Sequence, residues 1–462
     1  MIIVWLLPGS PAGRFLGVWL FNFFLSTCYS LLATYGIDMK SIAFMTLGCK
    51  VNQYETALLK DNLKKDYHIL YCEEKADIYI INTCTVTKRS DQKSRQYIRR
   101  VLLRNLDAEV IVTGCYAHRF PEEIKSISNR CIVFNNDDKQ NILNYLGIRA
   151  ERQNSILSSF DGHARAFVKV QDGCDSFCAY CAVPYARTRI YSKPLVEVIR
   201  EIKELLKNGY KEIVLCGINL GIYQSDSMNL SDLLIEISNI KGLRRLRLSS
   251  LEPDTITDRL IETLSNLPNF CRFLHIPLQS GDDNILGLMK RRYNIKTYRY
   301  FIERLKVLMP DIAISSDIIV GFPGEDDISF EKTCNMIKSI GFARLHIFRF
   351  SPRPGTSAFN ITGRLPYEVV KERADRLAVL EKGLRKKFYS KYLDKEVEVL
   401  FEKRESRGLL GNAIRFKRGQ FISGLTRNYI KIIAEGYREY INRFAAVKIV
   451  SVLDKFCLGK II

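Results

Sequence analysis

The stretch GCDSFCAYC, residues 173–181, places three cysteines on one short loop and decides how the rest of the chain is interpreted. Cys174, Cys178 and Cys181 follow the spacing C-x3-C-x2-C, and the sequence offers no fourth ligand beside them. Structural zinc usually takes four ligands and favours paired C-x2-C units, so zinc is the alternative that we favour less. We predict an iron–sulfur cluster held by three thiolates, with one coordination position left open.

The cysteine loop follows the first of several strand-like apolar runs, at residues 165–170, 212–217, 245–250, 272–278, 313–322 and 343–350. Helical patterns separate these runs, for example Leu195–Lys207, Ser231–Ile240 and Thr297–Leu308. The alternation predicts a partial (β/α)6 barrel within a domain at residues 160–390, which ends in a long charged helix at 366–392. Functional groups of such barrels lie at the carboxyl ends of the strands, which is where the cysteine loop falls.

A second alternating series precedes the barrel and predicts an α/β domain with a parallel sheet at residues 39–152. Cys49, Cys84 and Cys115 each come directly after one of its strand-like runs, beside Gly, Asn or Thr. The carboxyl ends of parallel strands meet at one edge of the sheet, so these three thiols can converge there. We favour a second metal site; the alternative is three ordinary buried cysteines.

The two ends of the chain differ from this α/β pattern. Short strand-like runs joined by turns predict a small β-barrel at residues 393–457. Residues 1–38 carry no charge between Phe15 and Thr34 and could form a signal anchor or a membrane span. An oxidising destination conflicts with cluster chemistry, and Met39 precedes a plausible first strand. We therefore expect residues 1–38 to be an apolar extension outside the folded domains.

Composition narrows the class of protein. Hydrophobic residues make up 47% of the chain and charged residues 26%, which is typical of a globular protein and excludes a disordered one. The net charge of +20 favours a polyanionic partner, either a nucleic acid or an anionic membrane surface. The 13 cysteines are an odd number in a long chain, which favours metal ligation in a reducing compartment over a disulfide framework.

Together these motifs resemble the radical S-adenosylmethionine superfamily, and the cysteines in GCK, NTC and GCY resemble its methylthiotransferase branch. The strings SSLEP, HIPLQSG, IVGFPGE and FSPRPGT also match the family, and the terminal barrel resembles a TRAM domain, a nucleic-acid-binding module. LGCKVNQYE, TCTVT and DQKSR are most similar to the members that act on threonylcarbamoyladenosine in tRNA. One departure is that Thr188 and Tyr191 stand where the family tends to have Gly and Arg.

The resemblance implies two 4Fe–4S clusters and S-adenosylmethionine as cofactors. The open iron of the Cys174, Cys178 and Cys181 cluster would bind S-adenosylmethionine, whose cleavage yields a radical aimed at carbon 2 of the modified adenine. The second cluster, on Cys49, Cys84 and Cys115, would hold or supply the sulfur that a second S-adenosylmethionine methylates. The residues expected to contact the cofactor are Ser249, Glu252, Gln279, Gly321 and Gly324. Arg187 would contact the cofactor or the phosphate backbone, or else form a structural ion pair.

The implied partners are tRNA and a reductase or flavodoxin-type electron donor, in the cytoplasm, with no stable membrane association of the enzyme fold. The sequence does not specify the sulfur source. Two alternatives remain open. One keeps the chemistry but changes the target to isopentenyladenosine in tRNA or to a ribosomal protein. The other is a metal-bearing RNA-binding protein without catalytic turnover.

Overall fold

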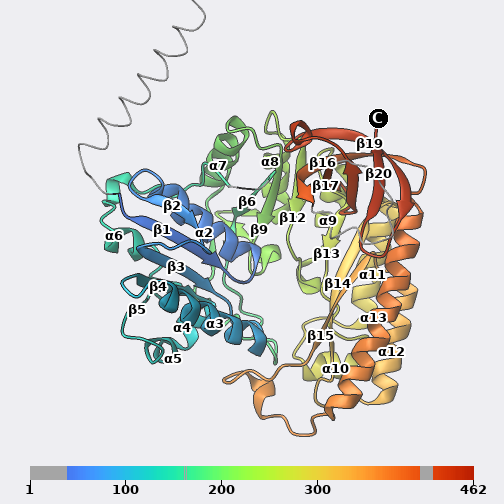
Figure 1. Cartoon of the computed structure of the whole chain (residues 1–462). Coiled ribbons are helices and arrows are strands. Elements are labelled where there is room, and N and C mark those ends of the chain that lie inside the picture. Colours follow the sequence, from blue (N-terminus) through green and yellow to red (C-terminus); the bar gives the residue numbers. More distant parts are fainter. Residues whose placement is uncertain (1–38, 161, 163, 406–419) are drawn as a thin grey trace, which may run out of the picture.

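An α/β domain, a half-open barrel and a small closed barrel follow one another along the chain (Figure 1). The structure is a computed structural model that describes residues 39–160, 162, 164–405 and 420–462. The expectation for residues 1–38 lies outside the described residues. Within the described part of the chain, no helix combines the length and the apolar character needed to cross a bilayer.

The N-terminal domain is a parallel sheet with strand order β2-β1-β3-β4-β5, which confirms the predicted α/β class. Its strands are β1 Ser41–Thr46, β2 His68–Tyr71, β3 Ile78–Thr83, β4 Glu109–Gly114 and β5 Cys131–Val133. Its helices are α2 Lys50–Leu63, α3 Lys88–Arg104, α4 Cys115–Arg119, α5 Pro121–Lys125 and α6 Asn141–Tyr145. The strand order reverses between β1 and β3, and ligands bind at the carboxyl ends of the strands at such a point.

Both faces of this sheet are covered, which explains why its central strands are apolar throughout. Side chains of β3 alternate between two apolar clusters: Tyr79 and Ile81 face one side, whereas Ile78 and Ile80 face the other. Thr87 accepts a hydrogen bond from the Ser90 backbone N–H and caps the start of α3. The strands are parallel, so their carboxyl ends lie along one edge of the sheet.

The central region forms the predicted partial barrel. Its parallel strands are β6 Arg165–Lys169, β9 Glu212–Cys216, β12 Arg245–Leu248, β13 Phe273–His275, β14 Ala313–Val320 and β15 Arg344–Arg349. They pair as two three-stranded sheets, β6-β9-β12 and β13-β14-β15, which are joined by isolated bridges such as Ser250 to His275. The outer helices are α7 Leu195–Lys207, α8 Leu230–Ser238, α9 Asp258–Asn266, α10 Asp283–Leu288, α11 Ile295–Leu308 and α12 Asp327–Ile340.

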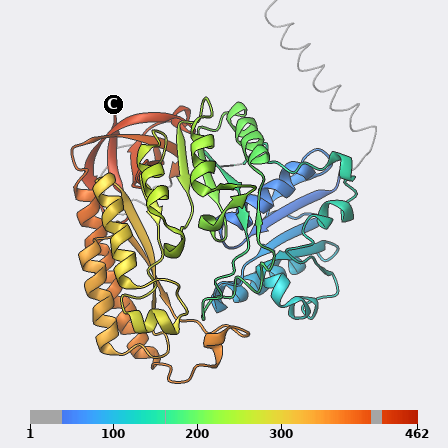
Figure 2. The same cartoon turned by 180° about the vertical axis from the view of Figure 1, so that it is seen from behind.

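A long helix, α13 Tyr367–Ser390, runs along the side opposite the N-terminal sheet and leads into the C-terminal barrel (Figures 1 and 2). The barrel strands are β16 Glu396–Glu405, β17 Phe421–Thr426, β18 Lys431–Glu435, β19 Phe444–Val452 and β20 Cys457–Ile461, closed in the order β16-β17-β18-β20-β19. The expected end of this domain at residue 457 is too early. The strand that closes the barrel begins at that residue, and five residues are too few to show a clear alternation.

The first domain and the half-barrel share one apolar core. Val51 and Tyr54 of α2 belong to the same buried cluster as Val168 of β6. The Tyr54 hydroxyl also donates to Glu201 of α7, with an O–O distance of 2.8 Å. Helix α2 therefore holds the carboxyl edge of the N-terminal sheet against the barrel strand that precedes the cysteine loop.

Candidate active site

The structure brings Cys49, Cys84 and Cys115 together at the edge where β1, β3 and β4 end. Cys49 precedes α2, Cys84 follows β3 directly, and Cys115 is the first residue of α4. The loops are in close contact, because a Cβ placed on Gly48 would lie 3.1 Å from the Cys84 sulfur. Burial, together with the nearby thiols of Cys115 and Cys49, raises the pKa of Cys84 to about 11. Such thiols become thiolates when a metal cation compensates their charge.

Cys174, Cys178 and Cys181 share the loop after β6 and the short strand β7 Gln171–Asp172. Burial, together with the neighbouring Cys178 and Cys174, raises the pKa of Cys181 to about 12. Nitrogen donors face the other two sulfurs: Arg291 Nη1 lies 3.2 Å from Cys178 and Asn219 Nδ2 lies 4.0 Å from Cys174. Three thiols on one loop suit an iron–sulfur cluster, and N–H groups directed at the sulfurs tune the properties of such a cluster.

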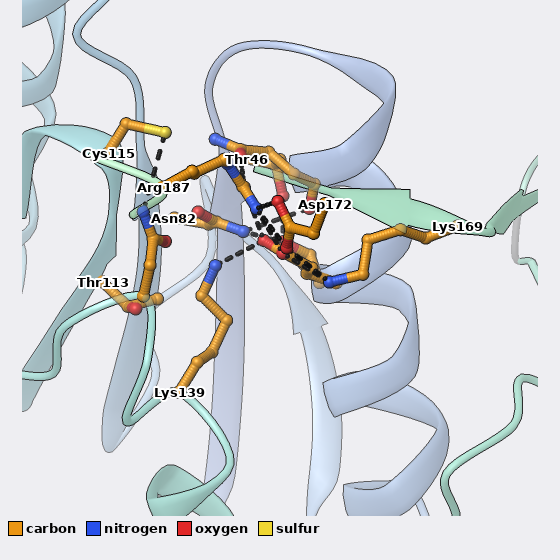
Figure 3. Close-up of polar contacts among 12 residues, drawn as sticks. Thr46, Asn82, Thr113, Cys115, Lys139, Lys169, Asp172 and Arg187 are labelled. Carbon is orange, nitrogen blue, oxygen red and sulfur yellow. Dashed lines mark hydrogen bonds and ion pairs between the residues drawn. The ribbon is translucent and has the colours of Figure 1, made fainter. Parts of the chain in front are cut away.

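A buried ion-pair network links the segments that carry the two cysteine sets. Figure 3 shows Arg187, Asp172, Lys169 and Lys139 of this network, with Cys115 nearby. Arg187 lies six residues after Cys181 and is only 3% exposed. Its Nη1 lies 2.9 Å from Glu55 Oε1 and 2.8 Å from Asp172 Oδ1, and its Nη2 donates to Asn52 Oδ1 at 2.7 Å. Asn52 and Glu55 follow Cys49 on α2, whereas Asp172 precedes the Cys174 loop. Of the roles expected for Arg187, the structure shows the ion pair.

Two lysines complete this network. Lys169 Nζ lies 3.0 Å from both Glu55 Oε1 and Asp172 Oδ2, and Lys139 pairs with the second Glu55 oxygen. Burial alone would raise the pKa of Glu55, but Arg187, Lys139 and Lys169 hold it well below its ordinary value. The carboxylate therefore stays charged, and the two domains are fixed to each other beside both cysteine sets.

Asn136 is a further residue at this junction that the sequence did not reveal. Its side-chain N–H donates to the Ala186 carbonyl at 2.6 Å and lies 3.8 Å from the Cys115 sulfur. The sequence signal is weak, because Asn136 belongs to a polar loop after β5 and carries no spacing relation to a cysteine.

Several expected cofactor contacts gather at the carboxyl ends of the barrel strands. Ser249 follows β12, and Gln279 lies between β13 and β14 with a φ of 62°. Ser249 Oγ and Gln279 Oε1 are buried without a hydrogen-bond partner, as is Asn219 Oδ1 beside Cys174. Buried polar atoms without partners are rare and fit a site that a polar ligand completes. Glu252 instead pairs with Arg291, the residue that faces Cys178.

Gly321 and Gly324 lie in a turn after β14, with φ values of 74° and 93°. A Cβ on Gly321 would fall 2.5 Å from Val370 of α13, and one on Gly324 would fall 2.8 Å from Leu288 of α10. The positive φ and the close packing of a helix therefore explain, without a ligand, why glycine stands at both positions. Their expected approach to a ligand gains no support from these contacts.

Comparison with known proteins gives the same picture. Residues 41–135 match the family described as Uncharacterized protein family UPF0004, and residues 168–337 match the Radical SAM superfamily. The chain is 38% identical to threonylcarbamoyladenosine tRNA methylthiotransferase MtaB of Bacillus subtilis (strain 168), covering 89% of this chain and 94% of that protein. It is 33% identical to tRNA-2-methylthio-N(6)-dimethylallyladenosine synthase of Endomicrobium trichonymphae, covering 87% and 96%.

Solved structures share the fold. The radical S-adenosylmethionine methyltransferase TsrM from Kitasatospora setae superposes with a TM-score of 0.53 at 12% identity, covering 69% of this chain and 75% of that chain. The identity is too low to carry more than the architecture. The identity to the methylthiotransferases is much higher, at 33–38%, and it extends over most of the chain. It agrees with the presence of two cysteine triplets at one domain junction. The chain belongs to the radical S-adenosylmethionine methylthiotransferase family.

Proposed function

We propose that this protein adds a methylthio group to carbon 2 of N6-threonylcarbamoyladenosine next to the anticodon of tRNA. The observation that carries the proposal is the juxtaposition of two cysteine triplets in a chain 38% identical to a threonylcarbamoyladenosine tRNA methylthiotransferase. One triplet suits the cluster that binds S-adenosylmethionine, and the other suits the cluster that provides sulfur. The buried network around Arg187 accounts for how they are kept together.

The residues divide the work between them. When bound, the clusters and S-adenosylmethionine supply one-electron chemistry at an unactivated C–H bond. We assign Cys174, Cys178 and Cys181 to one cluster and Cys49, Cys84 and Cys115 to the other. Arg291 donates toward the Cys178 sulfur and stabilises its thiolate. Ser249 and Gln279 offer unpartnered oxygen atoms to the polar groups of S-adenosylmethionine. We keep Glu252 as a contact that acts together with Arg291.

Partners and location are part of the proposal. The net charge of +20 supports an RNA partner, and the C-terminal barrel is the candidate TRAM-like module. We divide the enzyme into residues 39–152, 160–390 and a barrel from 393 through β20. A reductase or flavodoxin-type protein would supply electrons. Thiolate-bound clusters need a reducing compartment, which supports a cytoplasmic location.

The proposal is tested by mass spectrometry of tRNA nucleosides from a strain that lacks the gene. We expect loss of the 2-methylthio form of threonylcarbamoyladenosine and accumulation of the unthiolated nucleoside, with rescue by the wild-type chain and not by Cys178→Ala. Loss of the 2-methylthio form of isopentenyladenosine instead would assign the sister activity, which the 33% identity to the dimethylallyladenosine synthase also allows. Unchanged nucleosides would remove tRNA as the substrate.

A further inference from the structure

A group of three metal-ligating side chains lies on the barrel strands, apart from both cysteine sets. His275 ends β13, Asp317 belongs to β14, and His346 belongs to β15. Asp317 and His346 are direct register partners, whereas His275 is paired with Ser315, two residues before Asp317. Residues two apart on a strand share a face, so all three side chains emerge on one face of the sheet.

Their donor atoms are close together. Asp317 Oδ1 lies 3.1 Å from His275 Nε2 and 3.4 Å from His346 Nδ1, and all three ligand atoms lie within 4.8 Å of one another. Ligands at about 2.0 Å from a tetrahedral ion are about 3.3 Å apart, so these separations fit one ion at their centre. Asp317 Oδ1 is buried, and both imidazoles lie within ion-pair distance of it.

Ser315 lies at hydrogen-bond distance from the second ring nitrogen of His275. Its Oγ lies 2.8 Å from His275 Nδ1. If Nδ1 donates its hydrogen to Ser315, the lone pair of Nε2 faces the Asp317 carboxylate, an arrangement that is unfavourable unless a cation lies between them. A ring nitrogen anchored on an oxygen, with the other nitrogen turned to a shared centre, is the usual arrangement of a metal-binding histidine.

We propose that His275, Asp317 and His346 bind one divalent transition-metal ion with an N₂O donor set. Imidazole and carboxylate suit Zn²⁺, Fe²⁺ and Co²⁺, whereas the thiol sets elsewhere suit an iron–sulfur cluster. The side chains of His275 and Asp317 are 13% and 25% exposed, and that of His346 is 43% exposed, so the site is open on the β15 side. An open position there takes water or an oxygen donor such as a carboxylate.

The site is next to the groups assigned to S-adenosylmethionine. The Gln279 backbone N–H donates to the Asp317 carbonyl at 2.8 Å, and the Leu251 N–H donates to the His275 carbonyl at 3.0 Å. The proposed ion would thus lie on strands that adjoin the loops carrying the cofactor contacts. This inference rests on the geometry of the triad and not on the identity of the nucleoside.

The test is a titration of the full-length enzyme, with both clusters loaded and under anaerobic conditions, with Co²⁺. We expect one equivalent to bind and to show Co²⁺ ligand-field absorption, while cluster iron and sulfide stay constant. His346→Ala and Asp317→Asn should each weaken Co²⁺ binding more than tenfold, and Ser315→Ala should weaken it by about 10- to 100-fold. His68→Ala, on an exposed strand residue, is the control and should leave binding unchanged.

Two results would overturn the site. One is a wild-type enzyme that binds neither Co²⁺ nor Zn²⁺ beyond its clusters. The other is binding that persists unchanged in His346→Ala, which would place the ion elsewhere. His346 is partly exposed, so its substitution should leave the fold intact, and thermal melting of the variant verifies this.

Discussion

Arg187 shows how one side chain can fix the relation between two cysteine loops. Its guanidinium contacts Asn52 and Glu55 from the first domain and Asp172 from the second. Burying these charges is favourable only while each of them has a partner. The ion pair therefore fixes the relative position of the two domains more than it stabilises the fold. Removal of the arginine leaves buried carboxylates without full compensation, which is destabilising.

Arg187→Gln should destabilise the enzyme by about 3–5 kcal/mol, because it leaves two buried carboxylates with less compensation. Arg189→Gln is the matched control, since Arg189 is an exposed arginine two residues away, and it should change stability by less than about 0.5 kcal/mol. The measurement is urea unfolding of both variants and the wild type. Equal midpoints for the two variants would show that the Arg187 network does not hold the domains together.

The two cysteine sets should be separable by substitution. Cys178→Ala should abolish formation of 5′-deoxyadenosine from S-adenosylmethionine, because the cluster with the open position is lost. Cys84→Ala should retain this cleavage but yield no methylthiolated RNA. Each variant should lose about half of the iron and sulfide of the reconstituted enzyme. A Cys84→Ala enzyme that still methylthiolates RNA would contradict the assignment of the second cluster.

At the scale of single residues, the sequence predicted the cysteines, whose spacing forms a motif. It did not predict contacts between residues that are far apart in the chain. The six cysteines follow from their motif and from their positions after strands. Glu55 lies 132 residues from its partner Arg187, and neither neighbourhood signals the other. Asn136 was missed for the same reason, because its contact with Ala186 forms only once the two domains have docked, and its contact with Cys115 forms only once β4 and β5 pair in the sheet.

Among the secondary-structure elements, the turn between β4 and α4 determines where Cys115 lies. Gly114 has a φ of 98°, and a Cβ there would fall 2.3 Å from the Thr83 carbonyl oxygen and 2.5 Å from Asn82 Oδ1. Only glycine lets the ends of β3 and β4 approach this closely. Cys84 follows Thr83 and Cys115 follows Gly114, so the turn brings the two sulfurs into one site.

Gly114→Ala should separate the ends of β3 and β4, so that the first domain no longer binds its cluster. Gly147→Ala is the control, because Gly147 also has a positive φ, of 80°, but no atom within 4 Å of its would-be Cβ. Both variants place a side chain at a positive φ, which costs about 1–3 kcal/mol. Only Gly114→Ala should lower the iron content, by about half, and spare cleavage of S-adenosylmethionine. Full iron content in Gly114→Ala would show that this turn tolerates a side chain.

The elements themselves were largely predictable. The helix expected at Leu195–Lys207 has those bounds, and the barrel strands coincide with the apolar runs. Strand β2 was not predicted, because its four residues are partly exposed at the sheet edge and carry no clear alternation. Residues 406–419, between β16 and β17, lie outside the described residues.

In the whole molecule, buried arginines fix the C-terminal barrel onto the half-barrel. Arg245 Nη1 donates to the Leu425 carbonyl at 2.9 Å, and Arg247 Nη2 donates to the Thr426 carbonyl at 3.2 Å. Glu212 balances both charges from β9, with its Oε1 2.8 Å from Arg247 Nε. Because these groups are buried and paired, the candidate RNA-binding barrel has a fixed orientation relative to the half-barrel.

This docking should weaken in acid. Burial raises the pKa of Glu212, but Arg247 and Arg165 outweigh burial and hold it below its ordinary value of 4.5. A carboxyl group with a lowered folded-state pKa stabilises the fold above its unfolded pKa, and this stabilisation is lost as pH falls through the folded pKa. The stability difference between the wild type and Glu212→Gln should therefore be constant near neutral pH and shrink below about pH 4.5.

Urea unfolding of both proteins between pH 7 and pH 4 measures this difference. Glu398→Gln is the matched control at the same interface, because Glu398 also pairs with Arg245 but its side chain is 38% exposed. Glu398→Gln should lower the free energy of unfolding by less than about 1 kcal/mol at any pH. A Glu212→Gln penalty that stays constant down to pH 4 would mean that this carboxylate is not the acid-sensitive link between the barrels.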